Sequence, residues 1–309
     1  MIRFRIAALI VAVTALAVAG GFAFSTHAAP ATARHAVGAH FRDCANCPEM
    51  VVVPAGSFLM GSPASETGHR DSEAQHRVTF KKPFAVAKYT ITWDQWMACV
   101  RDRGCDGQAV EEALRIGQDG KPLGAAYVDH GRGNRPMVGE SWYDAQTYVG
   151  WLNRKTGSTG YRLLSESEFE YAQRAGTTTT FPWGDKADHN FANWGPEDDV
   201  KPLGPGFGGR DVWGMQTAPV GSFPPNAWGL YDMNGNVYQW IEDCNQPDVT
   251  KLPTDGSAQV EVGCRTRGLK SNSFESHTNS LRSANRSFPY APTLRGRDYL
   301  SIRVAKTLP

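Results

Sequence analysis

The side chains of this sequence that could most readily bind a ligand or metal ion lie in the stretch 228–243, WGLYDMNGNVYQWIED. Between its aromatic residues lie short side chains that all carry oxygen: Asp232, Asn234, Asn236 and Gln239. Such oxygens are the ligands that calcium prefers, and the D-x-N-x-N spacing is similar to that of an EF-hand loop. The sixth position of that loop must be glycine, however, and here it is Val237. The stretch is therefore either a structural turn packed by aromatic rings or a calcium site of another kind.

Length and composition set the outer limits of the fold. The chain has 309 residues, 41% of them hydrophobic, which is enough for one large domain or two ordinary ones. Its nine tryptophans and 32 glycines suit a loop-rich fold held together by large rings. The formal net charge is only +1, and the sequence has no basic stripe that could bind a phosphate backbone. We therefore expect no nucleic-acid partner.

The N-terminus predicts the compartment. Arg3 and Arg5 precede an almost wholly apolar stretch, residues 6–24, and small residues follow near a plausible cleavage point after Ala28. This pattern predicts a secretory signal peptide over residues 1–28, so we expect a secreted or periplasmic protein. An uncleaved membrane anchor is the alternative, because the apolar stretch is about long enough to span a bilayer. An alanine-rich linker, residues 29–47, is expected to follow.

An even number of cysteines in an exported chain indicates disulfides. We expect the six cysteines to pair with their neighbours in sequence: Cys44–Cys47, Cys99–Cys105 and Cys244–Cys264. A redox or metal-binding pair at Cys44-x-x-Cys47 is the alternative. A redox motif usually opens a helix, whereas the residues that follow here, 48–53, indicate a strand.

The first part of the chain shows strand patterns. Residues 50–53 and 57–60 flank a Pro-Ala-Gly turn and predict a β-hairpin. Residues 62–75 are polar and predict a surface loop. Two further strands are expected at 76–80 and 83–89.

Three helices are predicted from their N-terminal caps. Each begins at a capping residue with Gln, Asp or Glu three positions later: Thr92 with Gln95, Ser141 with Asp144, and Ser165 with Glu168. Apolar residues follow each cap at helical spacing, and Gly104, Gly157 and Gly176 end the helices. The segment 106–135 between the first two helices is rich in glycine and charge and predicts a long loop.

Isolated acidic residues and histidines in this sequence have structural explanations. Glu166, Glu168 and Glu170 fall in the expected third helix, where capping and the helix dipole explain acidic residues, so we assign them no catalytic role. Several histidines are scattered without the spacing of metal ligands: His69, His76, His130, His189 and His277. The sequence also has no HExxH motif and no nucleophile elbow.

A series of motifs occurs in a specific order: VPAGSFLMG at 53–61, RPMV and SWYDA within 135–145, YRLLSESEFEYA at 161–172, FPWG at 181–184, APV and PNAWGLYDMNGNVYQW within 218–240, LRSANR at 281–286 and SIRVA at 301–305. This pattern strongly resembles the formylglycine-generating enzyme family, also called sulfatase-modifying factors. The resemblance covers residues 48–306, nearly the whole chain after the expected signal peptide and linker.

The resemblance implies one α+β domain of the C-type-lectin-like sort, rich in loops, with short helices and strands and with structural calcium. It places one calcium site at Asp232, Gly235, Val237 and Gln239, where Gln239 stands in place of the usual Glu and weakens the site. It places a second calcium site at Asn193 and Trp194, together with Asp211.

Family enzymes oxidise a cysteine of a nascent sulfatase to formylglycine with oxygen and with copper held by two cysteine thiolates, which are soft ligands for copper(I). That pair follows an Arg-Gly-Gly-Ser-aromatic motif, whose degraded counterpart here is Lys270-Ser271-Asn272-Ser273-Phe274. No cysteine follows Cys264, so the copper site is absent from the sequence and copper is not expected.

Two functions follow from an intact scaffold without the thiolate pair. The first is an exported binding or accessory factor for a secreted protein, a peptide or a small ligand. The alternative is an oxidoreductase that modifies a protein or small-molecule thiol with a rebuilt site, for which the candidate catalytic residues are Ser273, His277, Arg282 and Arg286. The two arginines could equally form structural salt bridges. A third hypothesis is that the chain is a structural protein of the cell envelope. We expect a monomer. We expect it to be attached to a membrane only if the signal segment stays uncleaved.

Overall fold

The computed structural model describes residues 35–117, 120–124, 129–196 and 206–309. The expected signal peptide, residues 1–28, lies outside these ranges. Within them, no helix is both long enough and apolar enough to cross a membrane.

The strands form three small sheets. The largest is antiparallel, in the order β1 (His40–Phe41), β2 (Met50–Val53), β5 (Phe84–Ala87), β10 (Val304–Thr307) and β6 (Tyr161–Leu163). The second pairs β3 (Gly56–Met60) with β4 (His76–Phe80). The third places β7 (Tyr238–Cys244) between antiparallel β8 (Arg267–Ser271) and parallel β9 (Leu300–Ile302).

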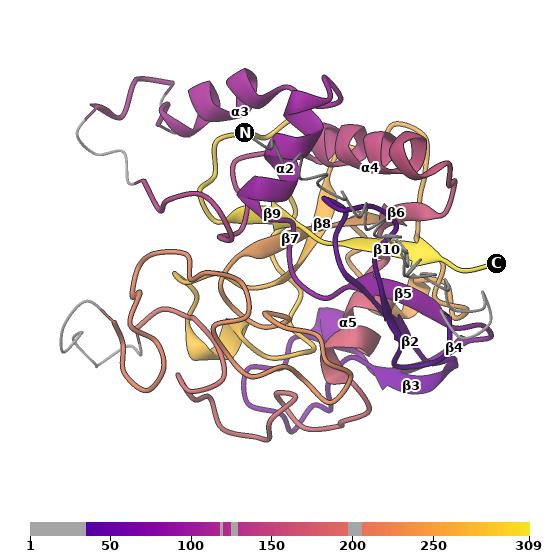
Figure 1. Ribbon diagram of the computed structural model, residues 1–309. Coiled ribbons are helices and arrows are strands. Elements are labelled where there is room, and N and C mark those ends of the chain that lie inside the picture. Colours follow the sequence, from indigo (N-terminus) through magenta and orange to yellow (C-terminus); the bar gives the residue numbers. More distant parts are fainter. Residues whose placement is uncertain (1–34, 118–119, 125–128, 197–205) are drawn as a thin grey trace, which may run out of the picture.

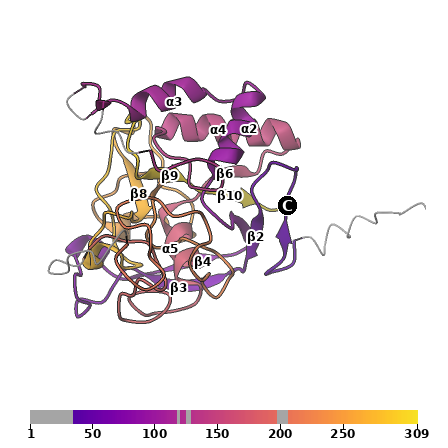
Figure 2. The same ribbon diagram turned by 60° about the vertical axis from the view of Figure 1, so that its left-hand side comes forward.

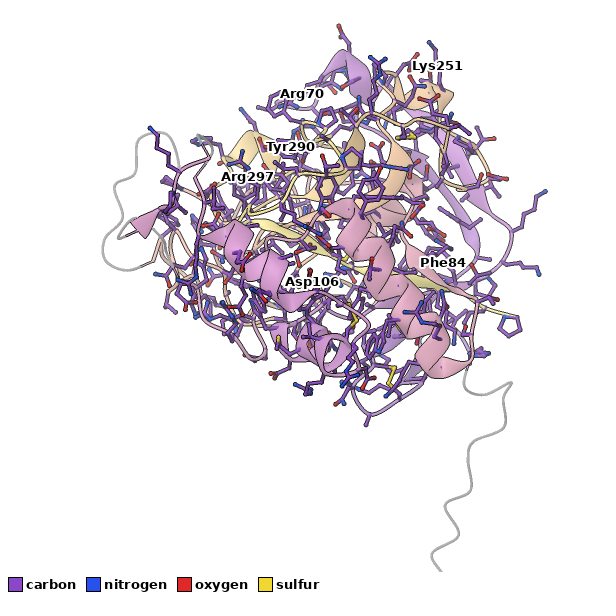
Figure 3. All side chains as sticks on the ribbon, turned by 90° about the horizontal axis from the view of Figure 1, so that it is seen from above. Arg70, Phe84, Asp106, Lys251, Tyr290 and Arg297 are labelled. Atoms are coloured by element: carbon purple, nitrogen blue, oxygen red, sulfur yellow. A yellow bond between two sulfur atoms is a disulfide. The ribbon has the colours of Figure 1, made fainter. Side chains whose placement is uncertain are left out.

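Helices lie on both sides of these strands. In Figure 1, α2 (Trp93–Arg101), α3 (Gly107–Leu114) and α4 (Trp142–Thr156) lie above the central strands, whereas α5 (Glu166–Arg174) lies below them. Figure 2 shows the same arrangement after rotation, and Figure 3 shows helices crossing the molecule as seen from above. Single turns of 3₁₀-helix occur at Asp71–Glu73, Val249–Lys251 and Thr278–Ser280.

The central strands β2 and β5 are buried on both faces, which explains their continuous apolar sequences. Along β2, Met50 and Val52 belong to one core cluster, and Val51 and Val53 belong to a second cluster. This division follows from the alternation of side chains along a strand. One β-strand layer therefore separates two hydrophobic cores.

The sheet begins earlier in the chain than expected. Strand β1 lies in the segment 29–47 that the sequence indicated as a linker, yet it pairs with β2 and buries Phe41. The folded domain therefore begins before residue 48.

The predicted hairpin between residues 50–53 and 57–60 is wrong. Both edges of β2 are occupied, by β1 and β5, so β2 has no edge left for β3. Strand β3 instead pairs with β4, with Gly56 opposite Phe80. A Cβ atom at Gly56 would lie 2.6 Å from the hydroxyl of Tyr171, so this position requires glycine for its close approach to α5.

The three predicted helices are confirmed, and the capping interactions are those expected. Thr92, Ser141 and Ser165 each accept a hydrogen bond from the backbone three residues later and complete a capping box. The expected loop 106–135 is wrong in its first part, because it contains α3. Asp106 caps α3 by accepting from Ala109 N at 3.0 Å.

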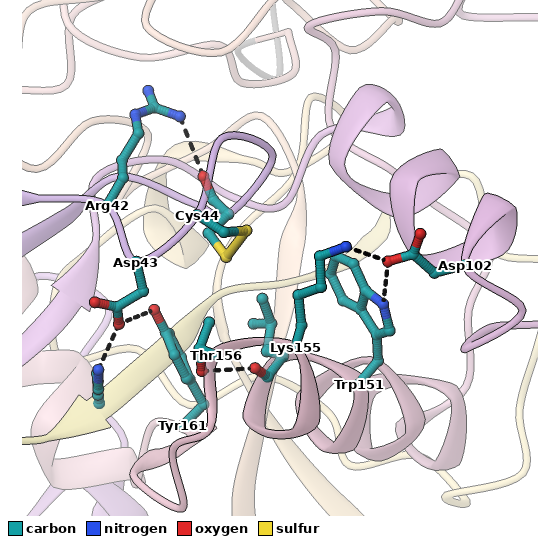
Figure 4. The surroundings of a disulfide bond; sticks show 11 residues. Arg42, Asp43, Cys44, Asp102, Trp151, Lys155, Thr156 and Tyr161 are labelled. Carbon is teal, nitrogen blue, oxygen red and sulfur yellow. Dashed lines mark hydrogen bonds and ion pairs between the residues drawn. A yellow bond between two sulfur atoms is a disulfide. The ribbon is translucent and has the colours of Figure 1, made fainter.

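The three expected disulfides are confirmed, at Cys44–Cys47, Cys99–Cys105 and Cys244–Cys264. Beside the first of them, Asp43 accepts a hydrogen bond from the hydroxyl of Tyr161 at 2.7 Å and pairs with Lys306 of β10 (Figure 4). These contacts attach the N-terminal segment to strands β6 and β10 of the main sheet.

Candidate functional site

The C-terminal segment after β8 carries all four candidate catalytic residues. The backbone turns at Ser271, whose φ is 66°, and Phe274 N then donates to Asn236 O at 3.1 Å. Further along, the hydroxyls of Ser276 and Tyr238 form a hydrogen bond of 3.0 Å. These contacts hold the segment against β7, the strand that follows residues 234–236, which we call the NGN turn.

A cavity of about 220 Å³ lies at this junction, and we call it the hydroxyl pocket. Its lining is dominated by hydroxyl groups and aromatic rings: Tyr238, Leu269, Ser273, Glu275, Ser276, His277, Ser280, Ser287, Phe288, Tyr290 and Tyr299. Tyr290 is labelled in Figure 3. Of the predicted candidates, Ser273 and His277 lie at this pocket. Tyr238 lies on β7, more than fifty residues before Tyr290 and Tyr299, so no local spacing in the sequence could have indicated this grouping.

Two tyrosines of the pocket, Tyr238 and Tyr299, are hydrogen-bond donors at neutral pH. The hydroxyls of Tyr290 and Tyr299 lie 3.4 Å apart, and the rings of Tyr238 and Tyr299 meet edge to face with centroids 5.9 Å apart. Burial raises the pKa of Tyr238, and burial together with Tyr290 raises the pKa of Tyr299. The phenols of Tyr238 and Tyr299 therefore stay protonated and present polar O–H groups in a mostly aromatic wall.

Glu275 adds a carboxyl group with an altered pKa. Loss of solvation and the negative charge of Asp298 raise the pKa of Glu275, while His130 opposes this shift. The imidazole of His130 is buried and lies 3.0 Å from Asp298. Its ring centroid is 5.1 Å from that of Phe274. The pocket thus combines phenolic and aliphatic hydroxyls with one carboxyl group whose protonation its neighbours control.

Arg282 does not reach this pocket. Its guanidinium forms a bidentate ion pair with Glu73, at 2.8 and 3.0 Å, and contacts Glu66 at 2.7 Å. Both Arg282 and Glu73 are almost completely buried. The expected surface loop 62–75 is therefore anchored in the interior at Glu73.

Arg286 is also committed to a structural pair. Its Nε and Nη2 atoms donate to the two carboxylate oxygens of Glu166 at 2.5 and 2.8 Å. Arg282 and Arg286 therefore form the structural salt bridges that were one of the two hypotheses for them. They do not converge with Ser273 and His277 on one site.

The first residue set expected to hold calcium forms hydrogen bonds with an internal cation. That set is Asp232, Gly235, Val237 and Gln239. The buried guanidinium of Arg303 donates to Gln239 Oε1 at 2.8 Å and to Asp232 O at 3.3 Å. Gly235 O accepts from Val237 N and from the hydroxyl of Ser271. A calcium ion at Gln239 would lie beside a buried positive charge, so this arrangement does not fit calcium.

The second expected set fits calcium better by its chemistry. Asn193 and Asp211 are buried, and Asn193 Oδ1 and Asp211 Oδ2 accept no hydrogen bond within the described part of the chain. Asp211 Oδ1 accepts from Trp213 N and Gly214 N at 3.1 Å. His189 Nδ1 lies 3.4 Å from Asp211 Oδ2, and the His189 ring stacks on Trp194 at 4.0 Å. Two buried oxygens without donors are hard ligands of the kind that calcium requires.

The cysteines of this chain offer no free thiol in this structure. All six cysteines of the sequence are in disulfides, and none lines the hydroxyl pocket. A copper(I) site needs thiolates, so the residues present do not fit a copper–thiolate centre.

A model of the sulfatase-modifying factor enzyme 1-like domain matches residues 37–308. The chain belongs to this family. The formylglycine-generating enzyme of Thermomonospora curvata is 28% identical over 77% of this chain and 87% of its own length. The inactive C-alpha-formylglycine-generating enzyme 2 of Mus musculus is 32% identical over 71% of this chain and 80% of its own.

The structure of PvdO from Pseudomonas aeruginosa is similar to this sulfatase-modifying-factor domain, with a TM-score of 0.71 and 38% identity over 88% of this chain and 98% of that one. This similarity confirms the expected fold class. The chain spans about a third of the length of curated relatives named serine/threonine-protein kinase pkn1, such as that of Chlamydia caviae, at 35%.

Proposed function

We propose that this chain is an exported sulfatase-modifying-factor domain that binds a peptide or polar small molecule in the hydroxyl pocket, as a binding or accessory factor for a secreted protein. It does not generate formylglycine with copper. The observation that carries this proposal is the lining of the pocket, which offers hydroxyls and one carboxyl group but no sulfur. The existence of relatives named as inactive supports a binding role for the scaffold.

We also propose that this domain binds one structural calcium ion. Asn193, Trp194 and Asp211 would hold the ion, and it would neutralise the buried carboxylate of Asp211 and fix the loops around it. The hydroxyl pocket itself works through the chain's own groups. The phenols of Tyr238 and Tyr299 would donate hydrogen bonds to a ligand, and Glu275 would accept one when ionised.

The proposal is tested with three peptides that differ only in a central cysteine, serine or alanine. We expect calorimetric titration to show the tightest binding of the serine peptide and weaker binding of the cysteine and alanine peptides, because a hydroxyl accepts a hydrogen bond well whereas a thiol accepts one only weakly. Tyr238→Phe should weaken binding of the serine peptide by about 1 kcal/mol, roughly fivefold, through loss of one hydrogen bond. The exposed Tyr143→Phe on α4 is the matched control.

The same cysteine peptide, incubated with copper and oxygen, should yield no aldehyde by mass spectrometry. A formylglycine-generating enzyme serves as the positive control. Aldehyde formation by this chain would contradict the proposal and favour an oxidoreductase with a rebuilt site.

A further inference from the structure

A second, smaller cavity of about 100 Å³ lies between the segments 182–191 and 224–234, and we call it the aromatic pocket. It shares no lining residue with the hydroxyl pocket. Its partly exposed rim includes Trp183, Phe191, Pro224 and Pro225, whereas its buried base includes Asp232 and Asn234.

The aromatic rim is held in place by ring stacking. The ring of Trp183 lies nearly parallel to those of Phe181 and Phe191, with centroid separations of 5.2 and 5.4 Å. The indole N–H of Trp183 donates to Lys186 O at 2.9 Å. Because this donor is already used, the rim offers apolar surface rather than a hydrogen-bond donor.

The described side chains at the base of the aromatic pocket, Asp232 and Asn234, present acceptors to it. Asn234 Nδ2 donates to Leu281 O at 2.7 Å, which fixes the orientation of the amide. The other end, Asn234 Oδ1, is buried and receives no hydrogen bond from the residues described. Asp232 Oδ2 accepts from Gly221 N at 2.9 Å, which leaves Oδ1 for a further donor. A buried acceptor without a donor is costly, so these oxygens favour a ligand that brings donors.

The charge around the aromatic pocket favours a cation. None of the described residues that line it is Lys, Arg or His, and Asp232 contributes a carboxyl group. Burial raises the pKa of Asp232 to about 6, with opposing effects from Gly221 N–H and Arg303. The guanidinium of Arg303 is held by Gln239 and by the carbonyl oxygen of Ala87, and it does not line the pocket.

We propose that the aromatic pocket binds the ammonium group of a primary alkylamine. An ammonium group has three N–H donors for Asp232 Oδ1 and Asn234 Oδ1, and its aliphatic stem would lie against the rings and prolines of the rim. The volume corresponds to about three water molecules, which suits an ammonium group with a short stem. Calcium is disfavoured, because it requires six to eight oxygen ligands. The amine could be a free alkylamine or a lysine side chain of a peptide.

The test titrates n-butylamine into the full chain at pH 7 and follows the fluorescence of the tryptophans, with n-butanol as an uncharged ligand of the same shape. We expect saturable binding of n-butylamine and none of n-butanol. Asp232→Asn keeps an acceptor for Gly221 N but removes the charge, and it should weaken binding at least tenfold. Asp255→Asn, at an exposed carboxylate outside the pocket, should bind like the unaltered chain.

A second variant keeps the proposal testable if Asp232→Asn does not fold. Phe191→Ser removes a partly exposed ring of the rim and should weaken binding severalfold without altering the charge. Tighter binding of N-acetyl-lysine methylamide than of n-butylamine would identify a peptide lysine as the ligand, and the reverse order would identify a free amine. Equal binding of n-butylamine and n-butanol, or unchanged binding by both pocket variants, would overturn the proposal.

Discussion

Arg282 and Glu73 lie 209 residues apart in sequence and form a bidentate ion pair in the interior. This pair fastens the C-terminal segment that carries the hydroxyl pocket to the loop that joins β3 to β4. It therefore positions the pocket without contributing a group to it.

Removal of this arginine tests its structural role. Arg282→Ala leaves the carboxylate of Glu73 buried without its partner, and loss of one partner of a buried pair costs about 3–5 kcal/mol. Urea denaturation should show that decrease in the free energy of unfolding. The control Arg77→Ala, at an exposed position on β4, should change it by less than about 0.5 kcal/mol. An Arg282→Ala protein of unaltered stability would mean that the pair is not structural.

Calcium should stabilise the folded chain through one residue set only. With free calcium at about 100 times its dissociation constant, binding adds roughly 2.7 kcal/mol to stability, so Tm should rise with calcium and fall with a chelator. Asp211→Asn should abolish this shift, because it removes the carboxylate charge of the proposed site. Asp232→Asn should retain the full shift, since its region is organised by Arg303. The reverse pattern would move the calcium site to the NGN turn.

Stability should decline toward alkaline pH because of Asp243. Its two carboxylate oxygens accept from Glu166 N and Gln259 N, each at 2.8 Å. Burial, followed by the negative charge of Glu166, raises the pKa of Asp243 from 3.8 to about 8. Between those values the folded state keeps a proton that the unfolded state has released. The stabilising contribution is thus complete below about pH 4 and is lost as pH rises through 8.

The measurement is urea denaturation between pH 5 and pH 9. From Asp243 alone we expect a loss of roughly 4 kcal/mol over this range, because about three pH units lie between pH 5 and its folded pKa and each corresponds to about 1.4 kcal/mol. Asp243→Asn cannot ionise and should flatten this dependence, although the amide satisfies only one of the two N–H donors and should lower stability at pH 5. Asp255→Asn should leave the slope unaltered. An identical slope for Asp243→Asn would show that another group titrates.

Local signals in the sequence were sufficient for α2, α4 and α5, and long-range pairing was not predictable from them. The capping residues Thr92, Ser141 and Ser165 act on neighbours three positions away, so the sequence contains the whole interaction. The hairpin expected at residues 50–60 failed because the partners of β2 depend on β5, more than thirty residues later. Helix α3 was missed because the glycine-rich and charged composition of 106–135 obscured the cap at Asp106.

The candidate site shows the same division. Its segment was located by the position of Ser273 and His277, whereas the roles of its arginines depend on Glu73 and Glu166, which are distant in sequence. Likewise, the contact of Gln239 with Arg303 crosses 64 residues and could not be read from the NGN turn alone. The spacing of the motifs indicated which segments carry candidate site residues. The hydrogen-bond and ion-pair partners of those residues are distant in sequence and follow only from the fold.

The central claim is that this sulfatase-modifying-factor domain contains no thiolate pair for copper. The most direct measurement is alkylation of the exported protein under denaturing conditions without reductant, followed by mass spectrometry of the intact chain. The account predicts no alkylated cysteine, because all six are in disulfides. Alkylation of two cysteines in this experiment would contradict it, since those two sulfurs would be free thiols that could hold copper.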